Sequence, residues 1–298
     1  MDFKTFLANA WQEHADNPRA VADRLGDALA LVDSEAQIPE LAHLANHVFG
    51  AHLGVWREGL GFLDRLPKLP AFKVDGPSDA ALRRSSSSLL LAAGLEDTRS
   101  ALSPADSIRV GAMAATTLAE RDTARAMKLF EEALAQMRAA QLPDNDPANR
   151  ALAVTGNNLA SALEEKPSRT GAERELMILA AQTGRRYWEI AGTWLETERA
   201  EYRLAMTWLK AGDADQARRH AQACLTIVAA NDGPALERFF GFEALALAEH
   251  SAGNSMSLTD AVAAARTTFE KIDADDRGWC AETLDKLNAL ATTTSRSG

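Results

Sequence analysis

The feature that most constrains the fold is the stretch RLAMTWLKAGDADQARRHAQACL, residues 203–225. Leu204, Ala205 and Trp208 recur at helical spacing and form one apolar edge. Gly212-Asp213 then interrupts the pattern, and a second apolar edge follows, made by Ala217, Ala221, Cys224 and Leu225. This pattern predicts a helix, a tight turn and a second helix, with small residues where the two backbones must approach closely.

Similar helix pairs recur through the second half of the chain. One alanine can be matched in each of four pairs, at separations of 46, 45 and 41 residues: Ala114, Ala160, Ala205 and Ala246. A nearly fixed period of helix pairs is typical of a solenoid. The last predicted helix, residues 276–291, has no partner after it, so we expect it to cap the final apolar face of the array.

Breaks in the helical pattern divide the chain into four parts. Residues 1–66 read as two helical hairpins, which are a weaker match to the repeat. Residues 67–78 contain three prolines and a glycine without helical periodicity, so they are predicted to be a linker. The repeat array with its capping helix is assigned to residues 79–291. Residues 292–298 are predicted to be a disordered tail.

Composition excludes several classes of function. The 298 residues carry a formal net charge of −10 and no block of Lys and Arg, whereas nucleic-acid binding requires clustered positive charge. No stretch of about 20 apolar residues is present, so we expect no membrane span. The start of the chain does not have the pattern of a signal peptide. Two cysteines are too few for a disulfide framework, and we expect both to be reduced and buried in a cytoplasmic protein.

The pair in residues 203–225 resembles the tetratricopeptide repeat. Leu204-Ala205, Trp208, the Gly212-Asp213 turn and the alanines after it follow the order of that motif, although Ala221 stands where the family has an aromatic residue. The string NNLASAL, residues 157–163, resembles the longer repeats of kinesin light chains. The resemblance implies an all-α, right-handed α-solenoid of antiparallel helix pairs, whose first helices line a concave groove. It also implies a binding or scaffolding role rather than catalysis.

The same resemblance implies which residues face the groove. Asn158, Arg199 and Arg203 would face it, with Asn157 and Tyr202 beside them as further candidate peptide-binding residues. Arg199 and Arg203 are four residues apart and share a helix face, and two guanidinium groups beside an amide suit a carboxylate. The expected partner is therefore a protein or peptide segment that is acidic or bears a carboxylate. The alternative for the two arginines is pairing within their own helix, with Glu198 and Glu201, or solvation.

A histidine pair is the one other arrangement that could hold a ligand. His43 and His47 are four residues apart, a spacing that can chelate a metal on a helix. No His-Glu-x-x-His motif is present, and His52 is expected to lie beyond the end of that helix. A packed or solvated pair is the expectation, so no metal and no cofactor is predicted.

Three functions remain open at this level. The first is a non-catalytic interaction module that binds a partner segment in its groove. The second is a regulator that senses a ligand or peptide, and the third is a helical enzyme with its site in the groove. A pocket lined by several perturbed Glu, His or Cys side chains would favour the enzyme, and an open groove without such a cluster would favour the interaction module.

Overall fold

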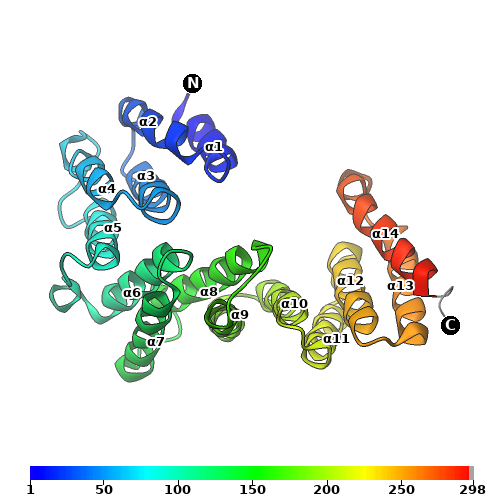
Figure 1. Cartoon of the computed structure of the whole chain (residues 1–298). Coiled ribbons are helices and arrows are strands. Elements are labelled where there is room, and N and C mark those ends of the chain that lie inside the picture. Colours follow the sequence, from blue (N-terminus) through cyan, green and yellow to red (C-terminus); the bar gives the residue numbers. More distant parts are fainter. Residues whose placement is uncertain (295–298) are drawn as a thin grey trace. The chain divides into compact units, whose positions relative to one another are not determined.

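The computed structural model describes residues 1–294 and forms two compact units, Met1–Ala148 and Asn149–Gly298 (Figure 1). Fourteen α-helices and four short 3-10 or π-helical segments account for all the regular structure in residues 1–294, and that part of the chain contains no strand. The expected all-helical fold is confirmed. None of the described helices is long and apolar enough to cross a membrane.

The N-terminal unit is built from short helices around one core. Its elements are α1 Phe3–Glu13, α2 Pro18–Ala28, η1 Leu29–Leu31, α3 Gln37–Ala45, η2 Asn46–Leu53, α4 Trp56–Leu63, η3 Leu66–Lys68, α5 Pro77–Ala93, η4 Arg99–Ala101, α6 Pro104–Leu118 and α7 Thr123–Ala140. Leu25, Leu41 and Leu63 are fully buried in a cluster that extends to Leu89 of α5. Because α5 packs against α3 and α4, the predicted linker at 67–78 connects helices that share contacts within one unit.

One helix of this unit continues further than the sequence predicted. The helix that carries His43 starts at Gln37, and after Ala45 it runs on as the π-helix η2 to Leu53. It ends at Gly54, whose φ of 65° is a left-handed conformation that glycine adopts without strain. The expectation that His52 lies beyond the helix end is therefore wrong.

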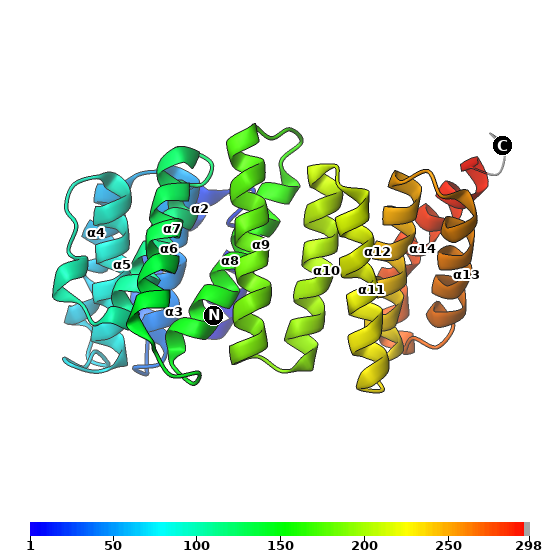
Figure 2. The same ribbon diagram turned by 90° about the horizontal axis from the view of Figure 1, so that it is seen from below.

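The C-terminal unit is a row of long helices (Figure 2). Its helices are α8 Pro147–Glu165, which starts at the boundary, α9 Gly171–Ala191, α10 Trp194–Ala211, α11 Ala214–Ala230, α12 Ala235–Ser251, α13 Ser255–Phe269 and α14 Ala274–Thr294. Each helix from α9 to α14 packs against the next in the chain, and α8 approaches α9 closely at Gly156. Contacts also join α10 to α12 and α12 to α14. Neighbouring helices in sequence are therefore neighbours in space, as helix pairs in a repeat would be.

The pair predicted around Gly212-Asp213 forms as expected. Gly212 ends α10 with a φ of 84°, and the Asp213 carboxylate caps α11 by accepting a hydrogen bond from the backbone N–H of Gln216. The four matched alanines are all 0% exposed, and Ala205 packs in a cluster with Ala221 of α11 and Ala244 of α12. The register of the predicted packing face is thus confirmed at the alanines, whereas Trp208 is only half-buried.

The last helix, α14, packs against the two helices α12 and α13, and its Leu287 is 1% exposed. The helix runs to Thr294, so residues 292–294 of the predicted tail are helical, and residues 295–298 lie outside the described residues. Cys224 and Cys280 are both free and buried, as expected.

Candidate functional site

A pocket of about 370 Å³ lies where α10, α12 and α14 meet. Its lining residues are Glu198, Arg199 and Tyr202 of α10, Leu236, Glu237 and Phe240 of α12, and Trp279 of α14. The volume falls within the range of about 300–1,000 Å³ that is typical of pockets for small ligands. All seven residues belong to the C-terminal unit.

Packing at small residues sets the spacing of these helices. α10 begins with a capping box, in which Thr193 caps the backbone of the first turn and the Glu196 carboxylate accepts a hydrogen bond from the backbone N–H of Thr193. One turn past the pocket, the cluster of Ala205 with Ala244 brings α10 and α12 close together. The longer side chains that precede Ala205 on α10 therefore lie where α10 meets α12.

Three aromatic rings form the apolar wall of the pocket. Phe240 stacks on Trp279 with ring centroids 5.3 Å apart and planes inclined by 18°. Tyr202 meets the edge of Phe240 at 5.9 Å. Trp279 is 56% exposed, which is unusual for so large an apolar ring, so one of its faces remains available to a ligand.

The polar side of the pocket holds a carboxyl group without a partner. Glu198 is 1% exposed, and neither of its carboxylate oxygens has a hydrogen-bonding partner among the described residues. Burial, reinforced by the nearby Glu237 carboxylate, raises the pKa of Glu198 to about 8. This carboxyl is therefore mostly protonated and neutral at pH 7.

The other two acidic groups are satisfied. Glu237 accepts a bidentate pair of hydrogen bonds from the Arg199 guanidinium, the shorter at 2.5 Å. The Tyr202 hydroxyl donates a hydrogen bond of 2.9 Å to Glu243, and burial raises the pKa of both partners. Glu198 differs from its neighbours because no basic side chain pairs with it, and the polar groups that influence its carboxyl are the Glu237 carboxylate and the Cys224 thiol. A carboxyl buried in this way is costly unless a ligand supplies a stronger partner.

The structure brings together only part of the site expected from sequence. Arg199 and Tyr202 line the pocket, whereas Arg203 turns to α8 and pairs with Glu164 at 2.5 Å. Asn157 and Asn158 lie on α8 outside the pocket lining, half-buried and exposed, respectively. Of the stated alternatives, pairing of the arginines with Glu198 and Glu201 of their own helix is not found, whereas Arg199 is partly solvated, with 59% of its side chain exposed.

Sequence reasoning missed Glu198, Glu237, Phe240 and Trp279. One signal for Glu198 was present, because Glu198 and Glu201 fall at helical spacing on the same stripe as Ala205. A carboxylate on a packing face must be paired or perturbed, and Glu201 is paired, with His220 at 2.6 Å and with Arg185.

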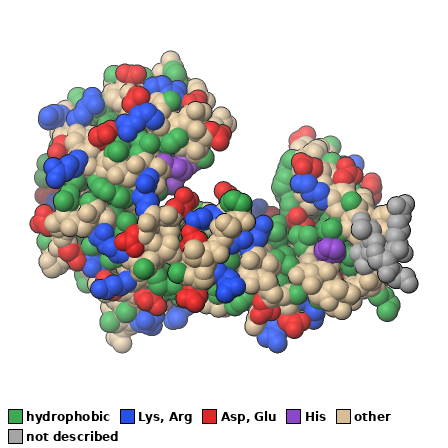
Figure 3. All heavy atoms as spheres, viewed as in Figure 1, with side chains coloured by type: hydrophobic (Ala, Val, Ile, Leu, Met, Phe, Trp, Pro, Cys, Tyr) green, Lys and Arg blue, Asp and Glu red, His purple; other side chains and the backbone are tan. Residues whose placement is uncertain are grey.

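A larger hollow of about 930 Å³ runs along α11, α12 and α13 but is chemically less distinctive. One of its two arginines, Arg218, already pairs with Glu249 at 3.0 Å and with Asp215 at 3.1 Å. On the face shown in Figure 3, basic and acidic side chains are interspersed rather than gathered into one basic patch. The smaller pocket is therefore the stronger candidate.

Comparisons with protein-family models, curated proteins and solved structures gave no match to this chain. Its function has to be argued from the chemistry of the pocket itself.

Proposed function

We propose that this chain is a non-catalytic helical-repeat protein of the tetratricopeptide type that binds a segment of a partner protein. The pocket between α10, α12 and α14 takes a basic side chain of that segment. The observation that carries the proposal is the buried, unpartnered Glu198 carboxyl beside the exposed, stacked ring of Trp279. A solenoid of antiparallel pairs would present α10 and α12 as neighbouring first helices of successive repeats.

A cation can interact both with the aromatic wall of the pocket and with the Glu198 carboxyl on its polar side. An ammonium or guanidinium group placed over aromatic faces gains about 2 kcal/mol when it is desolvated. The same group supplies the donors that Glu198 lacks and favours the ionised form of that carboxyl. The net charge of −10 adds a long-range attraction for a basic segment. We therefore expect Lys or Arg to be the anchor residue of the partner.

An acidic segment remains the second candidate. Arg199 favours it, because its side chain is 59% exposed and could reach a ligand carboxylate. Such a ligand would have to compete with Glu237 for Arg199 and with Glu164 for Arg203, and both of these carboxylates are buried. Freeing a buried carboxylate from its partner is costly, which weighs against this version.

The enzyme alternative draws on the same pocket. The raised pKa of Glu198 is the kind of perturbation that general acid–base catalysis uses. However, burial also raises the pKa values of Tyr202 and of the adjacent Cys224, so neither side chain is activated as a nucleophile. These pKa shifts support a role of the pocket in binding rather than in catalysis. The two free thiols suit a reducing compartment such as the cytoplasm, which we include in the proposal.

An array of random twelve-residue peptides, probed with the purified chain, tests the proposal. We expect bound peptides to be enriched in Lys and Arg, and replacing the anchor by Glu should abolish binding. Trp279→Ala should weaken binding by about thirtyfold, the equivalent of 2 kcal/mol. Met256→Ala is the matched control, because Met256 is an exposed apolar side chain of α13 outside the pocket.

Selection of acidic peptides that depends on Arg199 and Arg203 would instead support the second candidate. Equal binding of all peptides, or equal losses in Trp279→Ala and Met256→Ala, would contradict the pocket as the site of recognition.

A further inference from the structure

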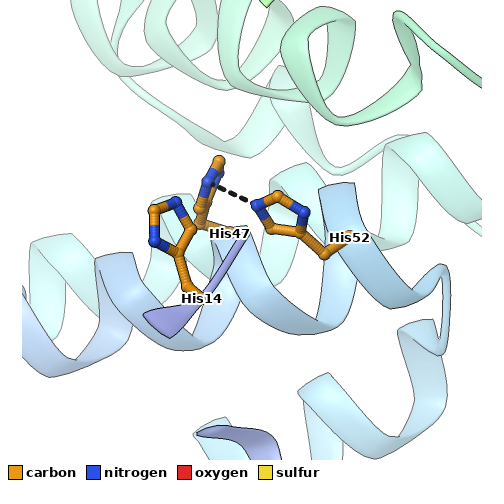
Figure 4. A group of neighbouring side chains, drawn as sticks. All are labelled: His14, His47 and His52. Carbon is orange, nitrogen blue, oxygen red and sulfur yellow. Dashed lines mark hydrogen bonds between the residues drawn. The ribbon is translucent and has the colours of Figure 1, made fainter. Parts of the chain in front are cut away.

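Three histidines from two separate helices converge in the N-terminal unit (Figure 4). His14 is the C-terminal cap of α1, and His47 and His52 lie in the π-helix η2. One ring nitrogen from each lies within 4.8 Å of those of the other two. The Nε2 atoms of His47 and His52 are 3.0 Å apart. All three side chains are half-buried, so the cluster is held in place yet open to solute.

The π-helix is what brings two of these side chains together. Residues five apart in an α-helix point roughly 140° away from each other, because each residue turns by about 100°. In a π-helix, hydrogen bonds join residues five apart, so His47 and His52 lie one turn apart on the same side. Such π-helical turns are frequently found at functional sites, where they re-aim side chains.

Hydrogen bonding orients the third histidine. The Nδ1 atom of His14 lies 2.6 Å from the carbonyl oxygen of Trp11. A carbonyl oxygen can only accept, so Nδ1 carries the proton and Nε2 keeps a free lone pair. A carbonyl that fixes the tautomer of a histidine in this way is the usual outer-shell support of a metal ligand. Trp11 also packs against the rings of His14 and His47, at 5.0 and 5.4 Å.

The facing Nε2 atoms of His47 and His52 also favour the binding of a cation. Two facing Nε2 atoms can share only one proton between them, so at most one donates. Neutral imidazoles with lone pairs directed at a common point are the form in which histidine binds metal ions.

We propose that His14, His47 and His52 bind one divalent transition-metal ion of the zinc class, with a fourth position left for water or an exogenous ligand. Three imidazoles without a carboxylate suit Zn²⁺, Co²⁺, Ni²⁺ or Cu²⁺ and not Mg²⁺ or Ca²⁺, which prefer oxygen ligands. Tetrahedral zinc with Zn–N bonds of about 2.0–2.1 Å spaces its ligand nitrogens about 3.4 Å apart. The present spacings require only small ring movements to reach it.

The spacing considered in the sequence, His43 with His47, does not form the site. His43 lies on the preceding turn, is exposed and is outside the group of three. It therefore provides a matched control on the same continuous helix: a histidine four residues from His47 that we expect not to ligate.

The full chain, freed of any histidine tag and treated with chelator, is titrated with Zn²⁺ by calorimetry and with Co²⁺ by absorption spectroscopy. We expect one ion per chain, a rise in the melting temperature on Zn²⁺ addition, and visible Co²⁺ bands of low-coordinate geometry. His52→Ala and, independently, His14→Gln should weaken binding at least tenfold, since even outer-shell changes cost about 10–100-fold. His43→Ala should bind as the wild type does.

Absence of binding at micromolar Zn²⁺ would overturn the proposal. Equal losses in His43→Ala and His52→Ala would also overturn it, as would wild-type affinity in both His52→Ala and His14→Gln. The use of two ligand variants from different helices keeps the test decisive if one of them fails to fold.

Discussion

Replacing Glu198 by glutamine should make the chain more stable, and increasingly so as the pH rises. The pKa of Glu198 is about 8 in the folded chain against 4.5 for an ordinary glutamate. Below pH 4.5 the carboxyl is protonated in both states and has no effect on the free energy of unfolding. Between pH 4.5 and about 8, the unfolded chain releases this proton while the folded chain retains it, so the wild type loses stability as the pH rises.

The magnitude follows from that difference. Each unit between the folded and unfolded pKa values corresponds to about 1.4 kcal/mol. From pH 5 to pH 8 the wild type should therefore lose up to about 4 kcal/mol through Glu198, and Glu198→Gln should lose none of it. Comparing the two proteins at both pH values isolates this ionisation, because any fixed cost of burying the amide is the same at each pH.

Urea denaturation followed by circular dichroism at pH 5 and pH 8 provides the measurement. The free energy of unfolding of Glu198→Gln minus that of the wild type should be larger at pH 8 than at pH 5 by about 3–4 kcal/mol. A difference between the two proteins that does not change with pH would refute the reasoning, because it would mean that Glu198 is ionised in the folded chain at neutral pH.

Three further predictions concern the fold. Far-ultraviolet circular dichroism of the full chain should show a helical spectrum, and a substantial strand contribution would contradict the architecture. Ala205→Trp should cost about 1–3 kcal/mol or more, because Ala205 is 0% exposed in a cluster with two other alanines, and an unchanged thermal melt would mean that the register is wrong. Gly156→Ala should also destabilise, since its added Cβ would lie 2.5 Å from the carbonyl oxygen of Ala180 on α9; Gly171→Ala, with open space around it, is the matched control. Equal melting temperatures for these two glycine variants would contradict the close approach of α8 and α9.

Local signals in the sequence predicted the helices well. The turn at Gly212-Asp213 could be anticipated because a left-handed glycine and an aspartate cap act within a few residues. The buried alanines could be anticipated because helical periodicity alone determines which face packs. The fold class was therefore accessible from the sequence of this chain, with the periodic helix pairs as the strongest indication.

The residues that make up the pocket and the histidine cluster could not be predicted in the same way. Arg199 and Arg203 find Glu237 and Glu164 on other helices, and such pairs depend on the tertiary arrangement rather than on spacing within one helix. The π-helix that aligns His47 with His52 involves a change of hydrogen-bond pattern that apolar periodicity does not reveal. The position of Trp279 over Phe240 depends on how α14 packs against α12.

Proton release on ligand binding tests the central claim most directly. A basic peptide selected from the array is titrated by calorimetry at pH 7 in buffers of different ionisation enthalpy. Because burial and the Glu237 carboxylate raise the pKa of Glu198 to about 8, most of these carboxyls carry a proton before binding, and a bound cation should drive that proton off. The account predicts release of nearly one proton per peptide from the wild type and almost none from Glu198→Gln. No release from the wild type, or equal release from both proteins, would contradict recognition of a cation at this pocket.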